Sequence, residues 1–130
     1  MAESEFYTPG ICNINPKEVA YRRKYAVGFG VAAVVVLILL LVFKAAPAVG
    51  LVLFLPIWLG SISELQARNH FCVSYAAAGE YNASDKFADV AKATAEQHAA
   101  DQKRARKLNL QAVLSGLVGA AVCVAILAII

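Results

Sequence analysis

The chain has 130 residues, of which 60% are hydrophobic, and its mean hydropathy of +0.62 is too high for an ordinary soluble domain of this size. Twelve Lys and Arg against nine Asp and Glu leave a net charge of only +3. The sequence holds no complete catalytic, cofactor or nucleic-acid motif, so we expect neither an enzyme nor a nucleic-acid-binding protein. The three cysteines, Cys12, Cys72 and Cys123, are odd in number and irregularly spaced, which argues against a disulfide framework.

The N-terminal arm, residues 1–24, combines a turn-prone stretch with the start of a helix. Asn15 is suited to the N-cap, Pro16 to the first helical position, and Glu18 to the third, from where it can reach back to the N-cap amide. We expect this helix to continue directly into the membrane.

Residues 25–63 are predicted to form a transmembrane helical hairpin. Tyr25–Phe43 is nineteen residues long without a charge or a proline, which is just enough to cross a hydrocarbon core of about 30 Å. Ala45–Ser63 contains prolines, and we expect a kink near Pro56. A cleaved signal peptide is the competing interpretation of the first span, but its apolar run exceeds the usual length.

Residues 64–109 are predicted to be a helical segment outside the membrane. Glu64–Ala78 continues the second span and ends at Gly79, and Asn82-Ala83-Ser84 fits a turn that enters a helix better than a glycosylation site. Ala-rich Asp85–Lys107 favours helix. It either forms one rod with the third span, Leu110–Ile130, or breaks near Asp101–Leu108 and lies along the headgroups; we favour the break.

The basic residues predict the orientation of the chain. Eleven of the twelve lie before the first span or between the second and third, and Lys44 in the hairpin turn is the exception. The positive-inside rule then places the N-terminus in the cytoplasm, or in the matrix of an organelle. The C-terminus, at the end of the transmembrane helix formed by residues 110–130, then lies on the outside. We expect the following membrane-interface anchors: Arg22, Arg23, Lys24, Trp58, Lys103, Arg104, Arg106 and Lys107.

Three residues on the predicted cytoplasmic side have metal-ligand chemistry. Cys12, His70 and Cys72 would suit zinc or copper(I). If Glu64–Ala78 is helical, however, His70 and Cys72 point in different directions and cannot chelate together, whereas a loop there would allow it. Arg68 is one helical turn before Cys72 and would stabilise a thiolate there. A buried, unreactive cysteine is the commoner case, and we expect His98 to be a surface histidine.

Small residues within the spans predict close helix packing. The positions are Gly28, Ala112, Gly116 and Ala120. None of the three spans contains an Asp, Glu, Lys, Arg or His side chain, and proton relays or coupled transporters usually need at least one of these. We therefore do not expect pumping or coupled transport by this chain alone.

Two stretches carry a resemblance to a known type of protein. They are Cys12-Asn13-Ile14-x-Pro16-x-Glu18 with Arg22-Arg23, and Leu65-Gln66-Ala67-Arg68-x-x-Phe71-Cys72 with Gly79-x-Tyr81-Asn82. Together they resemble small uncharacterised bacterial membrane proteins with three spans. The resemblance implies no particular activity. We expect the protein to lie in a bacterial inner (plasma) membrane.

The sequence thus predicts an all-α integral membrane protein. We expect an accessory or scaffolding subunit of a larger membrane complex, with the lipid bilayer and other membrane subunits as partners and no cofactor. A thiol, redox or metal-handling protein using Cys12 and Cys72, with zinc or copper, is the second hypothesis. A small homo-oligomeric pore is the third.

Overall fold

The computed structural model describes residues 6–130, so the first five residues of the predicted N-terminal arm lie outside it. Most of the chain is helical. Its elements in order are α1 (Pro16–Val42), the 3-10 helix η1 (Pro47–Leu53), α2 (Phe54–Asn69), α3 (Val73–Ala78), β1 (Glu80–Tyr81), β2 (Ala91–Lys92) and α4 (Ala95–Ile129). Three stretches are long and apolar enough to cross a membrane: Pro16–Val42, Pro47–Asn69 and Ala95–Ile129. The chain therefore has the architecture of an integral membrane protein.

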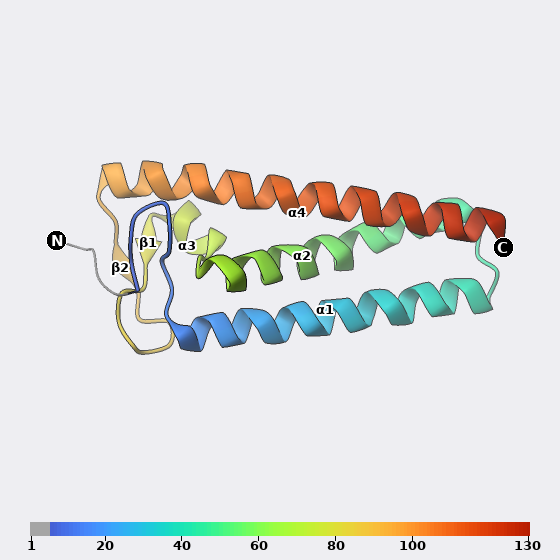
Figure 1. The fold of residues 1–130 in the computed structure, drawn as a ribbon, viewed down its shortest axis with the longest axis horizontal. Helices are drawn as coiled ribbons and strands as arrows, with labels where there is room; N and C mark the ends of the chain where they lie inside the picture. The colour runs from blue at the N-terminus through green and yellow to red at the C-terminus, as the bar shows by residue number, and fades with distance from the viewer. Residues whose placement is uncertain (1–5) are drawn as a thin grey trace.

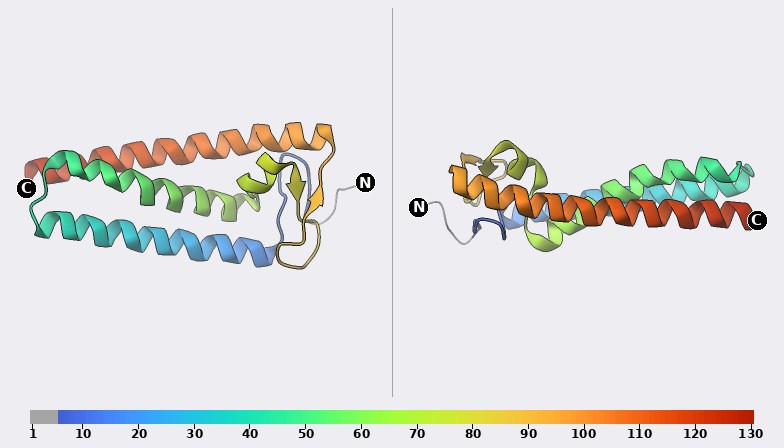
Figure 2. Two further views of the ribbon diagram at one scale, coloured as in Figure 1. Left: turned by 180° about the vertical axis from the view of Figure 1, so that it is seen from behind. Right: turned by 90° about the horizontal axis from the view of Figure 1, so that it is seen from above.

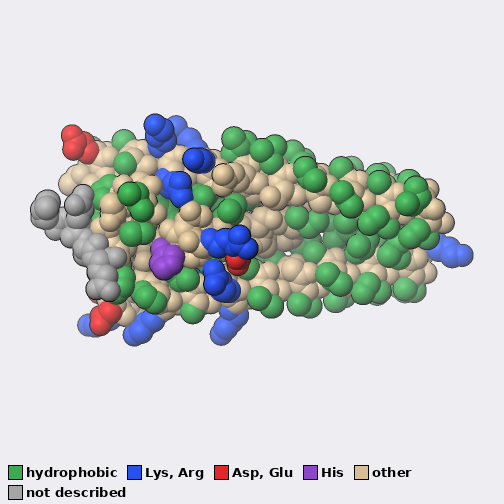
Figure 3. Space-filling view, in the orientation of Figure 1, with side chains coloured by type: hydrophobic (Ala, Val, Ile, Leu, Met, Phe, Trp, Pro, Cys, Tyr) green, Lys and Arg blue, Asp and Glu red, His purple; other side chains and the backbone are tan. Residues whose placement is uncertain are grey.

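The long helices form an elongated, open arrangement (Figures 1 and 2). Helix α2 packs against both α1 and α4, whereas α1 and α4 scarcely touch each other. Residues 6–15 and 70–94, with the helix ends that they contact, form what we call the polar head at one end (Figure 1). Figure 3 shows charged side chains gathered over this end and hydrophobic side chains over the other.

Helix α1 begins where the sequence predicts. The Asn15 side chain accepts a hydrogen bond from the Glu18 amide at 3.1 Å, and Pro16 occupies the first turn, where an amide hydrogen is not needed. The predicted return bond from the Glu18 side chain is wrong, because its carboxylate turns into the polar head instead.

The second span has two parts. After α1, Lys44 adopts a left-handed conformation with φ of 50°, and the amides of Lys44 and Ala45 bond to the carbonyls of Leu41 and Leu40. The chain returns as η1 and becomes α-helical at Phe54. Pro56 therefore lies in the first turn of α2, where its missing amide costs nothing, and the expected kink is replaced by a change of helix type just before it.

The predicted helix Glu64–Ala78 is interrupted. Helix α2 ends at Asn69, and His70 is left-handed with φ of 51°. The amide of Phe71 closes the end by bonding to the Gln66 carbonyl at 3.0 Å. Cys72 then caps the separate helix α3, accepting a bond from the Tyr75 amide through Sγ. The freed His70 carbonyl accepts from the Asn13 amide, which explains why the break is stable.

The predicted helix Asp85–Lys107 is wrong in its first half. Asn82-Ala83-Ser84 is a turn as predicted, with the Ser84 amide bonded to Asn82 Oδ1 at 2.9 Å, but it leads to a loop. Strand β2 then pairs antiparallel with β1, Glu80 opposite Lys92 and Tyr81 opposite Ala91.

Helix α4 starts only at Ala95 and then runs unbroken to Ile129, so the favoured break near Asp101–Leu108 is also wrong. Thr94 and Gln97 form a capping box at its start. One stripe of α4 is buried at every third or fourth residue: Asp101, Ala105, Leu108, Ala112, Gly116, Ala120, Cys123 and Leu127. Near the polar head, Ala105 and Leu108 pack against Phe71 and Ala76. The stripe of buried residues runs from the polar half of α4 into its apolar half, so contacts within the chain support both halves of the helix.

Candidate functional site

The polar head is organised around two buried carboxylates, each with both oxygens bonded. Glu18 is 1% exposed and accepts hydrogen bonds from the Tyr75 hydroxyl and from Asn82 Nδ2. Asp101, also 1% exposed, accepts from the Tyr7 hydroxyl at 2.9 Å and from the Gly10 amide at 2.7 Å. Satisfied carboxylates of this kind fix structure and leave no free oxygen for a substrate.

Three buried asparagines join the N-terminal arm to the loops that follow α2. Asn13 Oδ1 accepts from the Cys72 amide at 2.6 Å while its Nδ2 donates to the Cys72 carbonyl. Asn15 Nδ2 donates to the carbonyls of Ser84 and Lys86, both at 2.8 Å. The Asn82 amide donates to the Asn13 carbonyl at 2.9 Å. The described part of the arm is therefore hydrogen-bonded to the rest of the head at several points.

Tyr75 carries the clearest electrostatic perturbation in the head. Its partial burial, its hydrogen bond to Glu18 and the negative charge of that carboxylate together raise the pKa of the Tyr75 hydroxyl above its ordinary value of 10.0. The positive charge of Arg22 acts in the opposite sense. Tyr75 is thus held as a neutral donor to Glu18.

Cys72 has an arginine partner, but it is not the predicted one. Arg22 Nη2 contacts Cys72 Sγ at 2.8 Å from helix α1, fifty residues away in sequence. Arg68 instead bonds to Glu64 on its own helix at 2.6 Å. Cys72 is only 1% exposed, which restricts access of a solute to the sulfur. The contact ties α1 to the start of α3.

The predicted metal ligands are not assembled into a centre. Cys12 is half-buried in a turn closed by its amide and the Thr8 carbonyl, and His70 caps the end of α2. Among residues 6–130, no group of three or more His, Cys, Asp or Glu is placed to hold a metal ion. Metal binding through Cys12, His70 and Cys72 stays a prediction.

The basic residues named as anchors divide into two groups. Arg22, Arg23 and Arg104 have partners within the chain, namely Cys72, Glu64 and Asn69 respectively. The remaining four, Lys24, Lys103, Arg106 and Lys107, are exposed. Trp58 is half-buried and donates through its indole to Asn109 Oδ1 at 3.1 Å, which joins α2 to α4. Their anchoring role in a membrane stays a prediction.

The predicted packing residues fall on two different kinds of surface. Ala112, Gly116 and Ala120 are buried in the α4 stripe, and a Cβ on Gly116 would lie 2.9 Å from the Phe54 ring. Gly28 differs, because a Cβ there would meet nothing within 4 Å. Gly28 belongs to an outward hollow of about 410 Å³, which we call the open face of α1: Tyr21, Lys24, Tyr25, Gly28, Phe29 and Ala32.

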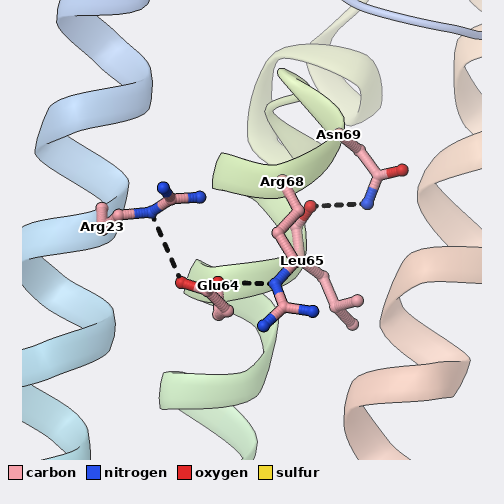
Figure 4. Close-up of polar contacts among 5 residues, drawn as sticks. All are labelled: Arg23, Glu64, Leu65, Arg68 and Asn69. Carbon is pink, nitrogen blue, oxygen red and sulfur yellow. Dashed lines mark hydrogen bonds and ion pairs between the residues drawn. The ribbon is translucent and has the colours of Figure 1, made fainter.

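A second hollow lies between the helices on the opposite side of α1. This membrane groove has a volume of about 610 Å³ and is lined by the following residues: Ala26, Val27, Gly30, Ala33, Pro56, Ile57, Gly60, Ser61, Glu64, Leu65, Arg68, Gln111 and Ser115. Glu64 lies at its charged end, between Arg23 at 3.6 Å and Arg68 at 2.6 Å (Figure 4). Neither hollow can be predicted from the sequence, because each depends on how α1 is rotated about its axis.

His98 also departs from the prediction of a surface histidine. It is half-buried, its ring lies against Gly79, and its Nε2 atom is buried without a hydrogen-bond partner among the described residues. The left-handed Gly79, with φ of 73°, allows this approach.

Comparison of the chain with protein-family models, with curated proteins and with solved structures gives no match.

Proposed function

We propose that the protein is an accessory subunit that packs against a transmembrane helix of a larger membrane complex and has no catalysis of its own. The observation that carries the proposal is the open face of α1. In the most apolar window of α1, 0% of the residues are buried inside the chain, compared with 28% for α4. Helix α1 is therefore the span with the most surface available to another protein.

The composition of the open face supports a helix as the partner. Gly28 and Ala32 are one turn apart and leave a shallow hollow where a second backbone can approach. Tyr21 and Tyr25 form one side of it, with ring centroids 4.8 Å apart. Gly116 uses the same packing principle inside the chain, which shows that this sequence packs helices through small residues.

The orientation is part of the proposal. Eleven of twelve basic residues belong to the polar head or to the helix ends next to it, which favours the head on the cytoplasmic side and Lys44 and Ile130 on the far side. Location in a bacterial inner membrane rests on the resemblance to small three-span bacterial proteins.

Co-purification from native membranes in mild detergent tests the proposal. We expect wild-type protein to bring down a stoichiometric membrane partner and Gly28→Leu to lose it, because a leucine fills the hollow. Gly30→Leu is the matched control: a Cβ at Gly30 also meets nothing within 4 Å, but Gly30 lines the opposite face of the helix. A wild-type protein that elutes alone, or a partner that Gly28→Leu retains, would contradict the proposal.

The contact between Arg22 and Cys72 supports a thiol function as the second candidate. The Arg22 guanidinium lies 2.8 Å from the Cys72 sulfur, the atom that would react with an oxidant or a metal ion. Because Cys72 is 1% exposed, this function requires the head to open. Maleimide should then label Cys72 in the native protein in an Arg22-dependent manner, and labelling only after denaturation would exclude it.

A further inference from the structure

The membrane groove differs from the open face of α1 because residues of three helices, α1, α2 and α4, line it. Its 610 Å³ lie within the usual range for small-molecule sites. Apart from Glu64 and Arg68, the residues that line the groove carry no charge, and those from α1 and α2 include Gly30, Ala33 and Ile57. This part of the groove therefore suits a hydrocarbon chain.

The end of the groove nearest the polar head is basic. Arg68 lines this end. Arg23 lies on the same face of α1 as the lining residue Val27, one helical turn nearer the polar head. Lys107 precedes Gln111 by one turn on α4, so it belongs to the same end. The single acidic residue among those that line the groove is Glu64. Three cations and one carboxylate leave a net positive charge at the mouth.

Each of the two arginines contacts Glu64 through a single nitrogen. Arg23 and Arg68 contact Glu64 through Nε, and Figure 4 shows the remaining nitrogens of both guanidinium groups beyond those contacts. The Arg68 side chain is 71% exposed. Guanidinium nitrogens in this arrangement suit a phosphate oxygen. Gln111, one turn after Lys107 on α4, also lines the groove and offers a side-chain amide.

We propose that the membrane groove binds an anionic phospholipid, with an acyl chain between α1 and α2 and the phosphate among Arg23, Arg68 and Lys107. The distribution of charge favours this ligand. The positively charged end of the groove complements a negative headgroup, and the uncharged lining of the rest complements an apolar tail. The site is separate from the proposed partner face, because Gly30 and Gly28 are on opposite sides of α1.

Native mass spectrometry of the purified full-length protein tests the site, with phosphatidylglycerol and phosphatidylcholine as probes. We expect wild type to retain phosphatidylglycerol preferentially. Arg68→Gln should weaken retention about fivefold, the effect of one basic side chain near an anionic membrane surface. Gly30→Leu should abolish it by filling the groove. Arg106→Gln is the control, because it removes the same charge from an exposed position that does not line the groove.

Glu64→Gln gives the test an outcome that loss of folding cannot produce. Removing the carboxylate should strengthen phosphatidylglycerol retention, because Glu64 repels the phosphate and occupies both arginines. Equal retention of the two lipids by wild type, or unchanged retention in Arg68→Gln and Gly30→Leu, would overturn the proposal. Loss of a protein partner in Gly30→Leu would also overturn it, by showing that a helix occupies the groove. Loss of the partner in Gly28→Leu with retained lipid supports both assignments.

Discussion

Glu18 shows how one buried side chain determines the structure around it. Its carboxylate accepts from Tyr75 on α3 and from Asn82 in the following loop, so it joins the start of α1 to both. The sequence predicted Glu18 only as a helix-capping residue, since its true partners are 57 and 64 residues away. Local spacing cannot reveal such contacts, whereas the Asn15 cap depends on neighbours and was predicted.

Replacing Glu18 with alanine should destabilise the protein strongly. The buried Asn82 amide and the partly buried Tyr75 hydroxyl would lose their bonds to the carboxylate. We expect a loss of about 3 kcal/mol in the free energy of unfolding, the scale of hydrogen bonds to a charged group. Lys17→Ala, at the exposed neighbouring position, is the control and should change stability little. Thermal unfolding in detergent measures both, and equal melting temperatures for the two variants would show that the Glu18 contacts do not hold the head together.

Tyr75 makes the head sensitive to alkaline pH. Because folding raises the pKa of Tyr75 above 10.0, its contribution to stability is complete below pH 10 and is lost as the pH rises further. Melting temperature should therefore fall more steeply above pH 10 in wild type than in Tyr75→Phe, which cannot ionise there. Parallel pH profiles for the two proteins would rule out this contribution.

Helix α4 shows the limits of prediction for an element. Its apolar half was predicted from hydropathy, but the polar half looked too weakly amphipathic to continue straight. The deciding contacts come from elsewhere: Asp101 accepts from Tyr7 and Gly10 of the arm, and Leu108 packs in the cluster with Phe71. The arm and the α2–α3 connection thus form the surface on which the polar half of α4 is buried.

A proline inside the polar half of α4 tests its continuity. Lys103 is exposed, so Lys103→Pro mainly removes a backbone hydrogen bond and introduces a steric clash, which costs about 3 kcal/mol in an intact helix. Lys103→Ala keeps the helix and serves as control. A proline variant as stable as the alanine variant would mean that the helix is already broken near residue 103.

At the scale of the whole molecule, composition predicted more than local pattern did. The three apolar stretches and the grouping of basic residues follow from the sequence, and the structure has three helices able to cross a membrane with the charges gathered at one end (Figure 3). The open face and the membrane groove could not be predicted. Both depend on α2 lying between α1 and α4, which leaves two opposite sides of α1 unfilled.

Photo-crosslinking in native membranes tests the central claim most directly. A photo-reactive aromatic amino acid in place of Tyr25, which lines the open face and is exposed, should form a covalent adduct with a different membrane protein. The same group at position 118, where Val118 is exposed on α4, should not. An adduct of the chain only with itself would support a homo-oligomer, and no protein adduct at position 25 would contradict the assignment of α1 as the surface that binds a partner.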